Sequence, residues 1–340
     1  MKIDIMQWLA GLNTTGPKKT MPILSFPSVQ LMDITVKELI SSSEMQARGM
    51  KLIADRTDSA ASVSLMDLSV EAECFGAKIV TSDDEVPTVV GAVVSSAEDA
   101  EKLQVPPMFS GRTGIYVDAI KRAVQLITDR PVFAGVIGPF SLAGRLVDVT
   151  EAMIYCYEDP DMLKTVLDKC TAFLTDYILE YKKVGAHGVV IAEPLAGLLS
   201  PALAEEFSEP YVRRIVEKVQ DENFIVIYHN CGNGTIQMID SILRTGCSAY
   251  HFGNAIDMRE MMKHIPENVI AMGNIDPAGE FRNGTPASIK KATKDLMRDC
   301  CKYPNFAISS GCDIPPMSKW ENIDAYFELS LIHISEPTRR

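Results

Sequence analysis

The stretch Phe224-Ile-Val-Ile-Tyr-His-Asn-Cys231 combines the features from which both the fold and the chemistry can be predicted. Its first five residues are continuously apolar, which is typical of a strand covered on both faces in a parallel sheet. Polar residues follow at once, where such a strand would end. Because strand geometry sends positions i and i+2 to the same side, His229 and Cys231 can face one point.

Seven further apolar runs of strand length occur along the chain, and longer amphipathic segments separate them. These runs are 22–26, 62–66, 132–137, 188–192, 248–252, 269–272 and 306–309. Strand-then-helix alternation implies parallel pairing through crossover connections. With 224–228 there are eight units, which predict an α/β fold, a (β/α)8 TIM barrel, as one domain over residues 1–329.

The amphipathic segments predict helices that pack outside the barrel. The clearest runs from Pro160 to Lys183, where apolar residues recur at steps of three and four. Similar patterns cover 201–219, 235–244 and 286–301, the last entered through the N-cap and first-turn signal Thr285-Pro286. Residues 81–107 break this alternation with an acidic run and prolines, and they are predicted to form a lid or a surface insertion.

Composition excludes several classes of protein. A net charge of -12 argues against nucleic-acid binding, which depends on Lys and Arg displacing counterions. No apolar stretch reaches the 18 or so residues of a membrane helix. The eight cysteines are too sparse for a disulfide scaffold and no secretory signal precedes them, so we expect reduced thiols in a cytoplasmic protein. Residues 330–340 continue no pattern and are interpreted as a non-native tail, which leaves His333 out of the chemistry.

The residues just past the predicted strands are where a parallel barrel carries its catalytic groups. Here they are rich in carboxylates and metal ligands, and they include Asp67, Glu193, His229 with Cys231, His251, Asp276 and Cys312. One imidazole and two thiols form a soft ligand set that suits tetrahedral zinc and leaves one position open. We therefore predict that His229, Cys231 and Cys312 bind Zn2+.

The fourth position on zinc stays open at this point. Glu193 and His251 both stand at strand ends and are possible ligands, and water or a substrate thiolate could equally occupy the position. The other six cysteines are predicted to be ordinary small core residues, because a lone buried cysteine usually acts as a small hydrophobe.

Five phrases carry a resemblance to a known family, and they are Met66-Asp-Leu-Ser-Val-Glu-Ala-Glu73, Gly138-Pro-Phe-Ser-Leu-Ala-Gly144, Glu193-Pro194 followed by Leu199-Ser-Pro201, Tyr228-His-Asn-Cys-Gly232 and Gly273-Asn-Ile-Asp-Pro277. They resemble the uroporphyrinogen decarboxylase superfamily over roughly residues 20–329, and most closely its methylcobamide:coenzyme M methyltransferase branch. The His-x-Cys pair with a distant Cys distinguishes that branch from the decarboxylases.

This resemblance implies a zinc-containing barrel that moves a methyl group from a methylated corrinoid to a small thiol. The corrinoid is expected on a separate protein, because the chain contains no Asp-x-His-x-x-Gly phrase for binding cobalamin. Asp67, Glu193 and Asp276 are the predicted catalytic residues. The resemblance places Asp67 toward a tetrapyrrole, and capping of the following helix is the alternative for the same side chain.

Two other functions remain open from the sequence. The first is a metal-free lyase like the decarboxylases. It is disfavoured because no arginine precedes Arg48 and because the phrase Ser309-Ser-Gly-Cys-Asp313 stands where the resemblance would place a decarboxylase histidine. The second is a non-catalytic barrel that binds a corrinoid protein and holds zinc, if at all, only as a structural ion.

Overall fold

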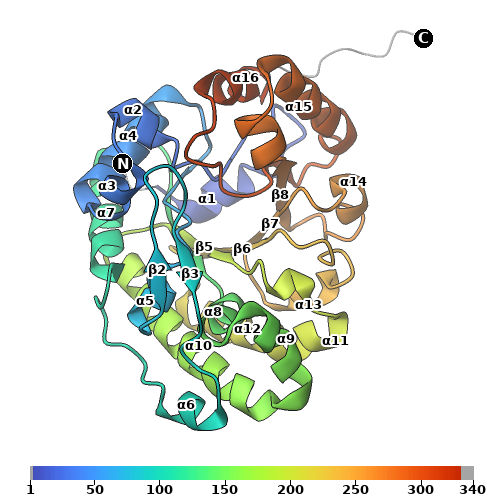
Figure 1. Cartoon of the computed structure of the whole chain (residues 1–340). Helices are drawn as coiled ribbons and strands as arrows, with labels where there is room; N and C mark the ends of the chain where they lie inside the picture. The colour runs from blue at the N-terminus through green and yellow to red at the C-terminus, as the bar shows by residue number, and fades with distance from the viewer. Residues whose placement is uncertain (1–2, 331–340) are drawn as a thin grey trace.

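The computed structural model describes residues 3–330, so the predicted tail lies outside the described residues apart from its first position. Seven parallel strands form one sheet in the order β1-β4-β5-β6-β7-β8-β9. Figure 1 shows β5 to β8 of this curled sheet with helices around it. The strands of the sheet are β1 (Ser62–Val63), β4 (Val132–Ile137), β5 (Gly188–Ala192), β6 (Ile225–Asn230), β7 (Ala249–Phe252), β8 (Ile270–Ile275) and β9 (Phe306–Ser310). The order follows the chain, as the predicted α/β barrel requires.

The barrel closes through an irregular segment rather than an eighth regular strand. Thr20 forms a parallel bridge with Ile308 of β9, and its carbonyl accepts a 2.8 Å hydrogen bond from the Ala60 amide just before β1. The prediction of a strand over 22–26 is therefore wrong. Pro22 has no amide to donate, and the Ile23 amide donates to the Ser310 hydroxyl at 3.0 Å instead of to a backbone carbonyl.

Alternation along each strand separates the barrel interior from the face covered by helices. In β6, Ile225 and Ile227 belong to the interior cluster, whereas Val226 and Tyr228 pack in the outer core. The next residue on the interior side is His229, which pairs in register with interior Ala192. The sequence of β6 therefore delivers its histidine to the inside of the barrel at the carboxyl end of the strand.

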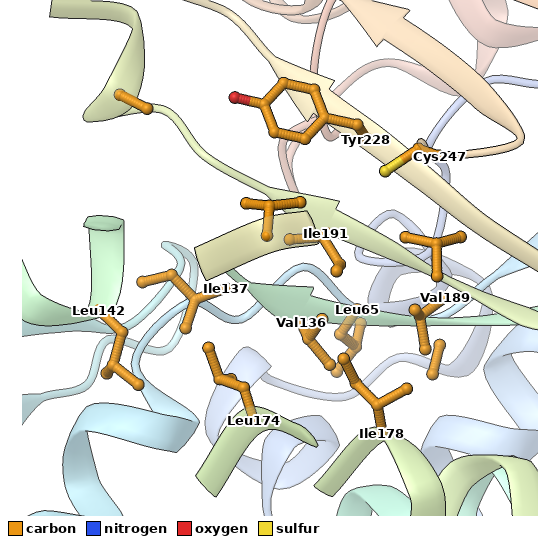
Figure 2. Packing of buried hydrophobic residues seen from close by; sticks show 14 of the residues in the cluster. Leu65, Val136, Ile137, Leu142, Leu174, Ile178, Val189, Ile191, Tyr228 and Cys247 are labelled. Atoms are coloured by element: carbon orange, nitrogen blue, oxygen red, sulfur yellow. The ribbon is translucent and has the colours of Figure 1, made fainter. Parts of the chain in front are cut away.

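Helices cover the outside of the sheet, as predicted. Figure 2 shows Leu174 and Ile178 of α10 facing Val136 and Ile137 of β4. The helices are α1 (Ile5–Ala10), α2 (Ser28–Met32), α3 (Val36–Ile40), α4 (Ser43–Arg56), α5 (Val70–Cys74), α6 (Ala97–Lys102), α7 (Thr113–Leu126), α8 (Pro139–Val147), α9 (Val149–Glu158), α10 (Pro160–Lys183), α11 (Pro201–Phe207), α12 (Glu209–Val219), α13 (Ile239–Arg244), α14 (Met258–Met261), α15 (Pro286–Cys300) and α16 (Trp320–Ser330), with a 3-10 turn at Ala196–Leu198 and a π-helical turn at Pro277–Arg282.

Two of the predicted helices need correction. The helix predicted over 201–219 is broken at Ser208, because Pro210 in the first turn of α12 has no amide with which to continue α11. The helix predicted over 235–244 begins only at Ile239. The Thr235 hydroxyl donates a 2.6 Å hydrogen bond to the Gly232 carbonyl, and residues 233–238 form turns before the helix begins.

The predicted excursion at 81–107 contains most of a small hairpin and one helix. β2 (Lys78–Val80) pairs antiparallel with β3 (Thr88–Val90), and α6 follows. The hairpin tip is held at both sides, because Asp83 forms an ion pair with Lys37 of α3 and Glu85 forms one with Arg282 in the turn after β8. Figure 1 shows the hairpin in front of the curled sheet. In residues 3–330, no helix has the length and apolar character needed to cross a bilayer.

Candidate metal centre

Three side chains that are distant in sequence meet at the carboxyl ends of β6 and β9. One ligand atom each from His229, Cys231 and Cys312 lies within 4.8 Å of the other two. The Cys312 sulfur lies 3.5 Å from Nε2 of His229. The structure thus brings together the three predicted zinc ligands, with His229 fully buried and both cysteines half-buried.

This geometry suits a tetrahedral zinc ion. Zinc bonds of about 2.0 Å to nitrogen and about 2.3 Å to sulfur, at tetrahedral angles, separate a nitrogen from a sulfur by roughly 3.5 Å and two sulfurs by roughly 3.8 Å. The observed separation of 3.5 Å between Nε2 and the Cys312 sulfur agrees with the first value. Three protein ligands would leave the fourth position for a reacting group.

The two thiols are electrostatically unequal. The hydrogen bond from Cys312, followed by His229, lowers the pKa of Cys231 to about 4 against the opposing effect of burial. The same contact with Cys231, together with burial, raises the pKa of Cys312 well above its ordinary value. In the metal-free protein the two thiols therefore share a proton, which a metal ion must displace.

Backbone packing holds Cys231 in place. Gly253, which follows β7, lies directly against it, and a Cβ atom at position 253 would come within 2.4 Å of the Cys231 Cα atom. Only glycine allows this approach, so β6 and β7 can bring their carboxyl ends together at the centre.

His251, one of the two candidates for the fourth ligand, lies beside the centre and not in it. Its Nδ1 is 2.8 Å from Nδ1 of His229, whereas the Cys312 sulfur lies at Nε2 of that ring. Its Nε2 is 2.7 Å from the Ser309 hydroxyl. Burial, followed by the neighbouring His229, lowers the pKa of His251 well below its ordinary value.

Glu193, the other candidate, points away from the barrel interior. Its carboxylate accepts hydrogen bonds of 2.9 Å from the Phe140 and Ser141 amides and one of 2.6 Å from the Ser141 hydroxyl. Burial raises its pKa to about 7, although these hydrogen bonds oppose the rise. Gly138 makes room for it, since a Cβ atom there would lie 2.2 Å from the Glu193 side chain. In the structure, Glu193 fixes the start of α8.

Asp67 is held in a buried network with Arg112. Its side chain is fully buried, and it accepts hydrogen bonds from the Ser69 hydroxyl at 2.6 Å and from the Tyr116 hydroxyl at 2.6 Å, besides its ion pair with Arg112. Arg112 also binds Glu73 at 2.7 Å. Asp67 accepts the Ser69 amide at 3.2 Å as well, so it supports the entry to α5.

Asp276 lies directly after β8 and begins the π-helical turn. Its Oδ1 atom accepts hydrogen bonds from the Ala278 amide at 3.0 Å and the Gly279 amide at 2.9 Å. Glu193 and Asp276 thus make capping contacts at the start of a helical segment, whereas Asp67 is held in a buried ion pair. The metal group contains none of these three predicted catalytic carboxylates.

Glu71 is a buried carboxyl group that the sequence analysis did not single out. Its Oε1 atom accepts a 3.2 Å hydrogen bond from the Ile137 amide, and its Oε2 atom has no partner among the described residues. Burial raises its pKa to about 8, with a smaller upward contribution from Asp67 and a lowering one from Arg112. The group is therefore protonated in the folded protein near neutral pH.

We expect Glu71 to make stability fall as pH rises. Between about pH 4.5 and pH 8 the folded protein keeps a proton that the unfolded chain releases, so the free energy of unfolding should decrease over this window and level off above it. Urea denaturation from pH 5 to pH 8, with chelator present to exclude metal, measures this slope. Glu71→Gln should make this slope shallower, leaving the part that Glu193 contributes, whose pKa burial raises to about 7. An unchanged slope would show that Glu71 ionises normally.

Comparison with known proteins identifies one family. The family model described as "Uroporphyrinogen decarboxylase (URO-D)" matches residues 25–330. The methylcobamide:CoM methyltransferase MtbA of Methanosarcina acetivorans is 29% identical over 269 residues, which cover 77% of this chain and 76% of that protein. The uroporphyrinogen decarboxylase of Coxiella burnetii is 28% identical over 254 residues, covering 72% of this chain and 69% of that protein.

A solved structure has the same fold. The methyltransferase from Methanosarcina mazei superposes with a TM-score of 0.84 at 22% sequence identity, covering 96% of this chain and 98% of that one. The likeness extends over almost the whole length of both chains, so the curled parallel sheet with its outer helices is the TIM-barrel-like fold of that protein.

Proposed function

The chain belongs to the uroporphyrinogen decarboxylase (URO-D) family, and on that basis we propose that it is a zinc-dependent methyltransferase. It moves a methyl group from a methylated corrinoid, carried by a separate protein, to a small thiol. The observation that carries this proposal is the convergence of His229, Cys231 and Cys312, whose ligand atoms lie within 4.8 Å of one another. The names of the methyltransferase relatives support the choice of reaction.

The protein's own residues favour a nucleophilic sulfur at this position. When bound, zinc would hold the acceptor thiol as a thiolate. A free thiol, with an ordinary pKa of about 8.5, is mostly protonated at neutral pH. Two cysteine sulfurs donate negative charge to the centre, which keeps a third sulfur nucleophilic. His229 is buried while both cysteines are half-buried, so a small thiol could approach the centre from the side of the two sulfurs.

The reaction is balanced without a further reactant. The acceptor sulfur forms a bond to the methyl carbon while the cobalt–carbon bond breaks, and that bond's electron pair stays on cobalt. The thiol proton leaves to solvent when the acceptor binds. Coenzyme M is the acceptor in the names of the relatives, and another small thiol is equally consistent with the residues of this centre.

A direct assay tests the proposal. Purified protein should contain about one zinc per chain, and with methylcobalamin and a panel of small thiols it should produce the methyl thioether, detected by mass spectrometry and by the change in cobalt absorbance. Chelation should stop the transfer, and added zinc should restore it.

Two other outcomes would overturn the proposal. Turnover of uroporphyrinogen that survives chelation would favour the metal-free lyase, which the decarboxylase relatives represent. Zinc binding that raises the melting temperature without any methyl transfer would favour the non-catalytic barrel.

A further inference from the structure

A chain of hydrogen bonds runs from the metal centre to the backbone on the opposite side of the barrel. Nδ1 of His229 lies 2.8 Å from Nδ1 of His251, and Nε2 of His251 lies 2.7 Å from the Ser309 hydroxyl. That hydroxyl donates to the Met21 carbonyl at 2.7 Å. All three side chains are buried, so no solvent competes for these contacts.

The Met21 carbonyl, at the end of this series of hydrogen bonds, determines the position of each proton in the series. A carbonyl oxygen can only accept, so the Ser309 hydroxyl proton points to Met21 and its oxygen must accept from Nε2–H of His251. A neutral imidazole has one N–H, which leaves Nδ1 of His251 as an acceptor. Nδ1 of His229 must then be the donor of the 2.8 Å contact.

His251 is 1% exposed, and the groups that it contacts, His229 and the segment Ser309–Ser310, include no acidic group among the described residues that would hold a second proton on its ring. The opposite direction of hydrogen bonding is disfavoured. Ser309 would then donate its proton to His251, and no proton would lie between the Ser309 and Met21 oxygens, which are 2.7 Å apart.

We propose that His251 is a positioning residue that fixes His229 in the Nδ1–H tautomer and so directs its Nε2 lone pair at the metal. The inference rests on the proposed zinc centre for its purpose, but the proton arrangement exists in the metal-free protein. Ser309 and the Met21 carbonyl anchor His251 in turn. His251, a strand-end residue of β7 that was a candidate ligand from its sequence, thus acts through His229.

The matched pair His251→Asn and His251→Leu tests this role. The two replacements have nearly the same shape, and both lose the contact with Ser309, but only asparagine can place an acceptor oxygen near Nδ1 of His229. Zinc affinity, measured by competition with a chromophoric chelator, should fall about 10- to 100-fold in His251→Leu, as for other outer-shell partners of metal-bound histidines. In His251→Asn it should stay within about threefold of the wild type.

A second readout needs no metal. Two-bond nitrogen–proton spectra of the metal-free, histidine-labelled wild type should show His229 as the Nδ1–H tautomer, and His251→Leu should shift it toward Nε2–H. Thermal unfolding checks that both variants fold. Equal zinc affinities for the two variants, or an Nε2–H tautomer of His229 in the wild type, would overturn the inference. A correct tautomer in a protein without methyl transfer would overturn only the proposed function.

Discussion

Cys312→Ser is expected to lose bound zinc and methyl transfer together. Cys312 supplies one of two sulfurs in a three-ligand group, and a serine hydroxyl does not ionise to an equivalent soft ligand. The loss of zinc affinity should exceed the roughly 10- to 100-fold that changes in outer-shell partners cost. His229→Ala and Cys231→Ala should behave in the same way. Metal analysis after dialysis and the methylcobalamin assay measure the two effects.

Cys301→Ser is the matched control for this experiment. Cys301 is also a half-buried free cysteine, but it lies at the end of α15 and outside the metal group. Its replacement should leave zinc content and transfer unchanged. If Cys312→Ser retains one zinc per chain and transfers methyl groups as fast as Cys301→Ser does, the metal centre is not the one that the geometry indicates.

Much of the fold could be predicted because buried parallel strands have continuous apolar sequences. Seven of the eight runs became strands, and α10 runs from Pro160 to Lys183, the same bounds as the periodic segment. The prediction of a strand over 22–26 was wrong because apolar content does not show which acceptors the backbone amides bind. Pro22 interrupts the ladder, so the segment closes the barrel with isolated bonds to β9 and to the residues before β1.

The family resemblance carried by the five phrases is confirmed by the URO-D model and by the methyltransferase relatives. The three predicted metal ligands meet in the structure because both strand ends open into the same mouth. The alternation of side chains along a strand could have distinguished the two candidates for the fourth ligand, Glu193 and His251. Glu193 lies two residues after Ile191, which packs in the outer core, so its side chain is directed at α8, whereas interior Ala249 places His251 on the same side as His229.

Other partners could not be read from the sequence, because they are joined by tertiary contacts alone. Arg112 reaches Asp67 across 45 positions, and Ser309 reaches His251 across 58. Neither residue is itself a typical ligand or catalytic group, although Ser309 stands three positions before Cys312. A buried carboxylate such as Asp67 implies that a cation lies beside it, but several arginines could supply that cation, and only the packing of α7 against α5 identifies which one.

Arg112→Leu is expected to destabilise the protein by roughly 3–5 kcal/mol, the usual cost of removing one partner from a buried ion pair. Arg112 is 12% exposed and Asp67 is fully buried, so the substitution leaves a carboxylate in the core with only hydroxyl and amide donors. Burial alone would lower the pKa of Arg112, but Asp67 and Tyr116 raise it above the ordinary value, so the guanidinium is a permanent cation in this network. Urea denaturation measures the loss.

Arg122→Leu on the same helix provides the comparison. Arg122 pairs with Asp118 one turn away, and both side chains are solvent-exposed, with Arg122 at 49%. Such surface pairs contribute about 0 to 1 kcal/mol, so this variant should stay close to the wild type. The double variant Asp67→Asn with Arg112→Leu should be less destabilised than the sum of the single changes, since the uncompensated charge is removed. If Arg112→Leu costs no more than Arg122→Leu, the buried network does not hold α5 and α7 at the barrel mouth.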